Sequence, residues 1–323
     1  MLNNDSDHEK LLRGAAEAAM RAPSIFNTQP WRWTVRGGAL ELRADRSRQL
    51  AVTDPDGRML TISCGIALHH ALVTLTADGH RPVVDRMPDP GDPDLLARIA
   101  LGGEITPADV RLRDAIDKRH TDRRPFSDVA VPDAVVDRLR GSAEERGVYV
   151  AELGPRSMVR FQVTAARAGE LDESDPAFQA ELAEWTHRPA DAGDGIAPST
   201  AVPATPRTVP LRSFYPDGGE RLLPGPGHDG GARYLVFWTT GDDPADWLAA
   251  GEATSAAMLE ATASGLAVSP MTDVVEVPAS RALLYRLLDH LGEAQMALRV
   301  GVPATPDDAP VSARRALSDV VDF

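Results

Sequence analysis

The chain has 323 residues, of which 43% are hydrophobic, and a formal net charge of −14 at pH 7. This length is enough for one large domain or two ordinary ones with a sizeable core. An acidic chain without a basic run is a poor partner for nucleic acid or for an anionic membrane surface, so we expect neither. The chain has a single cysteine, no apolar stretch of about 20 residues and a polar N-terminus without signal-peptide features, and we therefore expect a cytoplasmic protein.

The N-terminal region predicts a helix followed by a hairpin. Residues 7–21, DHEKLLRGAAEAAMR, put apolar side chains on one helical face. Residues 31–45, WRWTVRGGALELRAD, alternate in polarity on both sides of Gly37-Gly38, which is typical of two strands joined by a two-residue turn.

The rest of the chain predicts helices and strands around one long irregular segment. Residues 60–79 form an apolar helix closed by glycine, a small helix is expected over 94–100, and a helix over 109–124 ends in RHTDRRPF. Residues 186–231 are rich in Pro, Gly, Ser, Thr and Asp without a period, which is typical of a lid or a disordered segment. The other expected elements are a strand near 83–84, helices over 131–147, 156–173, 245–265 and 279–292, and strands over 147–153, 232–240 and 296–302.

Two helices are alike in kind. ALHHALVTLTADG (67–79) and TSAAMLEATASG (254–265) are both rich in alanine, and both end in T-A-x-G. A duplicated unit would explain this similarity. A chance likeness between two alanine-rich helices would explain it equally well, and these segments alone do not decide between the two.

The segment KRHTDRRPF (118–126) concentrates positive charge in an acidic chain. If it is helical, Arg119 and Arg123 share a face and can hold a phosphate between two guanidinium groups, with the Thr121 hydroxyl beside them. The alternative is a solvated basic turn that balances nearby aspartates. Arg314 and Arg315, in SARRALSDVV, are a weaker signal of the same kind.

The segment APSIFNTQPW (22–31) is suited to a flat ligand. Ser24 and Asn27 supply hydrogen-bonding groups, and the prolines restrict the backbone. The alternative is a plain helix-to-strand connection, and we expect Trp31 and Trp33 to be core residues in either case.

Together these three segments resemble the flavin nitroreductase family. Its subunits carry an Arg-x-Ser-x-x-[Arg/Lys] motif, an A-P-S-x-x-N-x-Q-P-W loop and a basic residue near the C-terminus. In the family the arginine motif precedes the A-P-S loop, whereas here the loop comes first. This order resembles the Acg-like fused members, in which two nitroreductase halves lie in one chain, and the resemblance covers nearly all of the sequence.

The resemblance implies an α+β fold with mixed and antiparallel sheets flanked by helices. Two half-units, 1–108 and 109–323, would form an intramolecular pseudo-dimer. Family flavin sites lie at the subunit interface, where one subunit binds the phosphate and the other binds the isoalloxazine ring. Here the first half has the A-P-S loop and the second half has the arginines. We therefore expect one FMN per chain and an inactive mirror site.

The resemblance also assigns the cofactor contacts. The phosphate and ribityl side is expected to bind Arg119, His120, Thr121, Arg123, Arg314 and Arg315. The ring is expected to contact the loop residues Pro23, Ser24, Ile25 and Asn27. The ring edge is expected to meet Pro270, Met271, Thr272 and Asp273. Thr272 and Asp273 depart from the glutamate and glycine that are frequent in the family.

The resemblance implies hydride transfer from NAD(P)H through FMN to a small aromatic or quinone-like acceptor, with no catalytic side chain. An alternative is an FMN storage protein in which 186–231 is a lid and NAD(P)H causes little turnover, and a weaker one is a pseudo-dimer without flavin. The histidines lack metal-site spacing, so no metal is expected. The chain is expected to be a monomeric pseudo-dimer or a loose homodimer.

Overall fold

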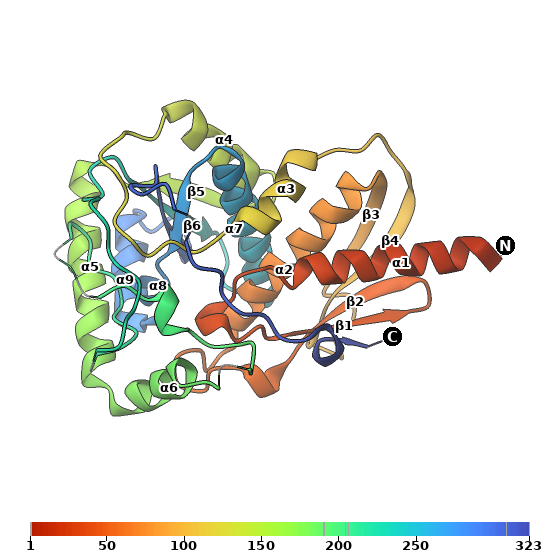
Figure 1. Cartoon of the computed structure of the whole chain (residues 1–323), viewed down its shortest axis with the longest axis horizontal. Coiled ribbons are helices and arrows are strands. Elements are labelled where there is room, and N and C mark those ends of the chain that lie inside the picture. The colour runs from red at the N-terminus through yellow and green to blue at the C-terminus, as the bar shows by residue number, and fades with distance from the viewer. Residues whose placement is uncertain are drawn as a thin grey trace.

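The computed structural model describes residues 2–189, 191–203, 205, 207–216, 218–307 and 309–322, with side chains from residue 7 onward. The predicted lid 186–231 is thus described except at 190, 204, 206 and 217, and the predicted C-terminal tail is described except at 308 and 323. Figure 1 shows the early elements gathered on one side of the molecule and the late elements on the other, with α2 and α7 between them.

The first sheet is built from four strands of the N-terminal third of the chain and the C-terminal strand β9 Val321–Asp322, in the order β3-β4-β2-β1-β9. The hairpin is confirmed, because β1 and β2 pair through Arg36 and Ala39 and both turn glycines have positive φ. The elements up to this point are α1 Leu2–Ala19, β1 Trp31–Arg36, β2 Ala39–Ala44, α2 Arg58–Ala77, β3 His80–Arg86 and β4 Leu95–Glu104.

The predicted small helix over 94–100 is wrong. These residues belong to the strand β4, which pairs antiparallel with β2 on one side and with β3 on the other. The local sequence, DLLARIA, favours a helix by propensity. The strand forms instead because Ala97 and Ile99, two residues apart, both lie on the buried face of the sheet. Pairing on both sides also satisfies the hydrogen-bonding groups of the backbone.

The second sheet has the order β5-β6-β8-β7. Its helices cover it in the same half of the molecule (Figure 1). The elements are α3 Val110–Lys118, α4 Asp133–Glu144, β5 Tyr149–Glu152, α5 Pro155–Ser174, α6 Pro176–Thr186, β6 Arg233–Thr239, α7 Pro244–Ala263, β7 Ala267–Pro270, α8 Asp273–Glu276, α9 Pro278–Leu287 and β8 Glu293–Gly301. α6 and α8 were not predicted from the sequence.

The two sheets repeat one design. β3-β4-β2-β1 corresponds to β7-β8-β6-β5, and every pair within these two sets is antiparallel. The helices α2 and α7 correspond as well, since each has 20 residues. This topology decides for duplication over compositional chance. We propose that the halves meet at 108 and 109, between β4 and α3.

α2 and α7 pack directly against each other at two glycines. Gly65 and Gly251 are each the eighth residue of their helix. A Cβ atom at Gly65 would lie 2.2 Å from the Leu248 carbonyl oxygen, and one at Gly251 would lie 2.1 Å from the Ile62 carbonyl oxygen. The close contact of two equivalent helices therefore requires both glycines.

α2 is also long and apolar enough to span a membrane by length and composition, but 89% of its apolar window is buried inside the protein.

The C-terminus returns to the first half. β9 Val321–Asp322 pairs parallel with β1, and the Trp33 N–H donates to the Val320 carbonyl at 2.8 Å. Figure 1 shows this dark blue tail crossing from the second half to the edge of the first sheet. Trp31 and Trp33, on β1, are fully buried, as the sequence predicted.

Candidate functional site

A pocket enclosing about 1210 Å³, including space open to solvent, lies where the two halves meet. Its walls come from the loop after α1, the pocket-facing side of α2, the segment after α3, the end of β7 and part of the 186–231 segment. Elements from both halves are thus needed to form it.

The pocket brings most of the predicted site residues together. Those that line it are Pro23, Ser24, Ile25, Thr121, Arg123, Pro270, Met271, Thr272 and Asp273. Those that lie outside its lining are Asn27, Arg119, His120, Arg314 and Arg315. His120 is half-buried.

The loop after α1 holds an unusual backbone conformation. Phe26, Asn27 and Gln29 have φ values of 46°, 55° and 50°, which non-glycine residues rarely adopt. Such strain costs about 1–3 kcal/mol per residue and is concentrated at functional sites. Two serines hold the loop in place: Ser63 Oγ accepts the Ile25 N–H at 3.1 Å, and Ser24 Oγ accepts the Gln29 N–H at 2.8 Å.

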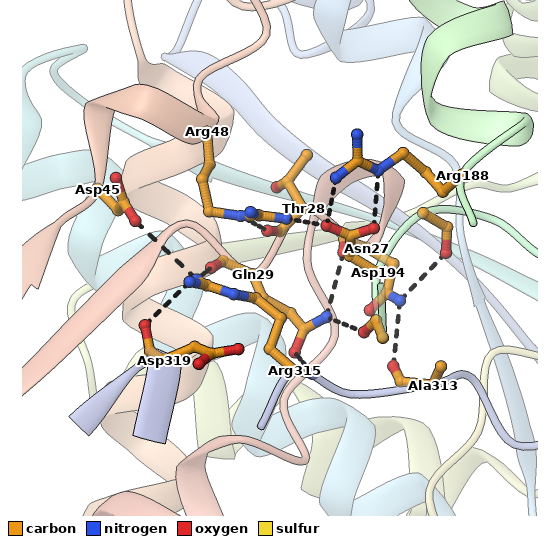
Figure 2. Close-up of polar contacts among 12 residues, drawn as sticks. Asn27, Thr28, Gln29, Asp45, Arg48, Arg188, Asp194, Ala313, Arg315 and Asp319 are labelled. Carbon is orange, nitrogen blue, oxygen red and sulfur yellow. Dashed lines mark hydrogen bonds and ion pairs between the residues drawn. The ribbon is translucent and has the colours of Figure 1, made fainter. Parts of the chain in front are cut away.

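Asn27, which was expected to contact the ring, lies outside the pocket lining. Its amide donates to the carbonyls of Gly195 and Ala313, both at 3.1 Å, and its Oδ1 lies 3.3 Å from Arg314 Nη1. Gln29, which the sequence analysis did not single out, donates to the Gly193 carbonyl at 2.8 Å. Figure 2 shows these side chains between the loop, the 186–231 segment and the tail. The Asn and Gln of the N-x-Q part of the motif therefore join the loop after α1 to the 186–231 segment, and Asn27 also joins it to the tail.

A buried ion pair anchors the 186–231 segment beside this loop. Asp194 is 2% exposed and accepts from Arg188 Nε at 2.8 Å and from Arg48 Nη2. Burial opposes ionisation, but the hydrogen bonds from Arg188 and Arg48 outweigh it and hold the pKa of Asp194 below its usual range. Arg48 also donates to the Thr28 carbonyl. The anchor thus joins the second half to the A-P-S loop of the first (Figure 2).

The segment after α3 is extended, so the predicted helix over 109–124 is too long. α3 ends at Lys118, and Thr121 forms a parallel bridge with Val268. In an extended chain alternate residues face the same side. Thr121 and Arg123 accordingly line the pocket, while Asp122 points elsewhere and binds Arg124 at 2.9 Å.

Arg119 is a buried cation that forms no ion pair with the residues that the structure describes. It is 5% exposed, and its Nε and Nη1 atoms have no hydrogen-bond partner among the residues that the structure describes. Burial, and after it the charge of Arg314, lowers the pKa of Arg119 to about 9. Arg314 is held by the carbonyls of Met20 and Arg21 at the end of α1. Two arginines whose charges repel each other at one site favour an anionic ligand.

Arg315 has a different position from Arg314. Its backbone N–H donates to Gln29 Oε1 at 3.0 Å, and its Nη2 donates to the Asp319 carbonyl at 2.9 Å. Its Nη1 lies 3.9 Å from Asp45 Oδ2 (Figure 2). Arg315 therefore ties the tail to the loop, whereas the charge of Arg314 lowers the pKa of Arg119.

Asp273 lies at the start of α8 and lines the pocket. Burial raises its pKa to about 6; Arg212 opposes this shift, and the charges of Glu276 and Asp172 add to it. The carboxyl group therefore changes its charge near physiological pH, beside the pocket.

Asp273→Asn is expected to change how stability depends on pH. A carboxyl group whose pKa rises from 3.8 to about 6 on folding takes up a proton, so its contribution is lost as pH rises between these values. Relative to D273N, the wild type should lose up to about 1.4 kcal/mol of unfolding free energy per pH unit between about pH 4 and 6. Urea unfolding of both proteins across this window tests it, and a constant difference would contradict the raised pKa.

The duplication relates the pocket to an equivalent position in the other half of the pseudo-dimer, and charged side chains lie at that position. Glu252 is the ninth residue of α7, as the pocket residue Ile66 is of α2. Arg86, at the end of β3, donates to Glu252 twice, at 2.6 and 2.7 Å. Arg146, in the turn that corresponds to the A-P-S loop, lies 3.0 Å from His69. Charged side chains thus occupy the place of the mirror site.

Some residues of the pocket could not be found from the sequence. They lie in the 186–231 segment, which has no hydrophobic period, and include Arg207, Arg212 and Phe214. Their composition gave no signal beyond a long irregular loop. Only the folded chain shows that this segment covers one side of the pocket.

No protein-family model matches the chain. "Putative NAD(P)H nitroreductase Rv3131" of Mycobacterium tuberculosis is 37% identical over 329 residues, which cover 100% of this chain and 94% of that protein. "Putative NAD(P)H nitroreductase acg" of the same species is 33% identical, with 96% and 95% covered.

Solved structures give weaker likenesses. The FMN- and NADPH-dependent nitroreductase NfnB of Sphigopyxis sp. strain HMH has a TM-score of 0.42 at 16% identity, over 66% of this chain and 98% of that one. An FMN-bound nitroreductase of Bacteroides fragilis has a TM-score of 0.38 at 11% identity, over 61% and 90%. The full-length sequence relatives decide the matter, and the chain belongs to the family of Acg and the related NAD(P)H nitroreductase proteins of Mycobacterium tuberculosis.

Proposed function

We propose that the protein is an FMN-dependent oxidoreductase of the nitroreductase type, with one FMN per chain. The observation that carries the proposal is the buried guanidinium of Arg119, whose Nε and Nη1 atoms have no partner among the described residues and whose charge is opposed by that of Arg314. Thr121 and Arg123, from the same segment, line a pocket that both halves form. A phosphate monoester carries nearly two negative charges at neutral pH and suits such a site. The names of the relatives support the same reaction class.

Each half of the chain would bind a different part of the cofactor. Arg119 and Arg314 would bind the phosphate, with Thr121 and Arg123 on the ribityl side and His120 beside them. The loop residues Pro23, Ser24 and Ile25, and the run from Pro270 to Asp273, would enclose the ring. Asn27 and Arg315 would act indirectly, since their hydrogen bonds hold the loop and the tail.

FMN, when bound, supplies reversible two-electron transfer between a nicotinamide cofactor and an acceptor. The chain's part is to position the reactants and to exclude water. We infer that the acceptor is a small aromatic or quinone-like molecule and that no side chain acts as a general acid or base.

One observation favours FMN storage as a second candidate. Residues of the 186–231 segment, among them Ile196 and Phe214, line the pocket, and a buried ion pair anchors this segment. A segment held in this way would act as a lid that limits access of NAD(P)H to the flavin.

Anaerobic mixing separates these functions. The purified protein is reconstituted with FMN, its FMN content is measured, and NADH or NADPH is added while the visible flavin absorbance is followed. Rapid bleaching with one FMN per chain is the expected result. FMN that dithionite bleaches and NAD(P)H does not would identify a storage protein. Failure to bind FMN at all would overturn both candidates.

A further inference from the structure

The pocket has more positive charge than the phosphate end requires. Arg207 lines it from the 186–231 segment, and its Nε donates to Thr205 Oγ1 at 3.1 Å. Its Nη1 atom is buried and has no partner anywhere in the described ranges of the chain. A guanidinium nitrogen that is buried without an acceptor is costly to keep, so a ligand that supplies an anionic oxygen there would be stabilised.

The neighbours of Arg207 do not neutralise it. Burial lowers the pKa of Arg207 to about 10, repulsion from Arg299 adds to this shift, and the charges of Asp229 and Asp122 offset only part of it. Asp122 is paired with Arg124 at 2.9 Å, and Asp229 is bound by Arg299 at 2.6 Å and by the Phe126 N–H at 2.7 Å, both through Oδ1. The Asp229 Oδ2 atom accepts no hydrogen bond from the residues described. Arg207 therefore does not form the ion pair that Asp229 already has with Arg299.

Arg212 provides an internal comparison, because it comes from the same segment and lines the same pocket. It donates to Asp172 at 2.8 Å and to Glu276 at 2.5 Å. The charges of these two carboxylates offset the effect of burial, and the pKa of Arg212 lies above its ordinary value. One arginine of the segment is thus held by carboxylates and the other is not.

Arg123 is the other pocket arginine without an ion pair in the described structure. Its Nη1 donates to the Thr200 carbonyl at 3.0 Å, and its guanidinium lies 4.7 Å from the Phe214 ring centre. Arg123 belongs to the predicted cofactor motif, and FMN would account for it. Arg207 does not belong to that motif, so its charge needs a separate ligand.

We propose that Arg207 binds a negatively charged oxygen group, a carboxylate or phosphate, of the second molecule that enters the pocket. This rests on the proposed function, in which that molecule is the acceptor or the nicotinamide cofactor. Arg207 would be a specificity residue that favours anionic ligands over neutral molecules of the same shape.

The test compares ligands matched in shape but not in charge. Binding of benzoate and benzamide to the FMN-loaded protein is measured by calorimetry for wild type, Arg207→Met, Arg207→Lys and the control Arg221→Met. Arg221 is exposed, comes from the same segment and lies outside the pocket lining. We expect the wild type and R221M to prefer benzoate by about 10-fold, the effect of one charge-assisted hydrogen bond. R207M should lose this preference, and R207K should keep part of it.

A second arm identifies the source of the anion. ADP-ribose, the unreactive phosphate-bearing part of the nicotinamide cofactor, is titrated into the same proteins. An acceptor site predicts that R207M changes benzoate binding alone, whereas a cofactor site predicts about 10-fold weaker ADP-ribose binding alone. If R207M binds both ligands as the wild type does, or only melts at a lower temperature, Arg207 is structural and the proposal is wrong.

The outcome is separable from that of the proposed function. Loss of FMN binding or of reduction by NAD(P)H in the wild type would contradict the oxidoreductase. The two titrations can still be made on the cofactor-free protein, where Arg207 lines the same pocket. A benzoate preference there that depends on Arg207 would uphold the anion site on its own.

Discussion

Arg119→Ala should release FMN while making the cofactor-free protein no less stable. Each charge-assisted hydrogen bond to the phosphate is worth about 1.5–3 kcal/mol, so the Kd for FMN should rise at least 10- to 150-fold. Without FMN, the buried guanidinium of Arg119 has no partner on Nε or Nη1 in the part of the chain described, and its removal relieves a desolvation penalty. The two effects have opposite signs, which an ordinary destabilising substitution would not produce.

Flavin fluorescence titration measures the Kd, and urea unfolding without FMN measures the stability. Arg113→Ala is the matched control, because Arg113 lies on the same helix α3 and is half-exposed in a surface ion pair with Asp78. It should leave FMN affinity unchanged. Full FMN content in R119A would remove Arg119 from the phosphate site. A large loss of stability without FMN would instead make Arg119 a structural residue.

Gly65→Ala should separate the two central helices and destabilise the whole protein. The new Cβ would lie 2.2 Å from the Leu248 carbonyl oxygen and 3.0 Å from Gly251 Cα, and both are backbone atoms that cannot rotate away. Overpacking of this kind costs about 3 kcal/mol. FMN affinity should fall too, because residues of α2, Met59 to Ile66, form one wall of the pocket.

Guanidinium unfolding with and without FMN tests this expectation, and Gly14→Ala is the control. Gly14 is exposed on α1, and a Cβ atom added there would meet no described atom within 4 Å, so alanine should stabilise the helix by about 1 kcal/mol. Gly251→Ala should behave like G65A, since the two glycines occupy equivalent positions. A G65A protein as stable as the wild type would show that the helices can move apart freely.

The sequence predicted the features that are encoded locally. The hairpin was found through Gly37-Gly38, and the long helices through their length and closing glycines. The strand β4 could not be found in this way, because DLLARIA favours a helix until β2 and β3 are present to pair with it. The same holds for RHTDRRPF, which is extended because Thr121 forms a bridge with Val268, about 150 residues later in the chain.

The sequence indicated which segments meet at the candidate site, but not how their side chains are oriented. The motif strings pointed to residues that meet across the two halves, and the resemblance to a known family made that possible. No string shows which way a side chain turns, so the sequence did not predict that the Asn27 amide donates to the carbonyls of Gly195 and Ala313. Arg207 lies in a segment without periodicity, and its position depends on the entire fold.

The parallel pairing of β9 with β1 has a consequence for how the protein is made. Val321 follows its strand partner Trp33 by 288 residues, 321 minus 33. Domains that are complete early can fold while the ribosome is still translating. The first sheet differs, because the edge strand β1 has no β9 to pair with until Val321 has been synthesised.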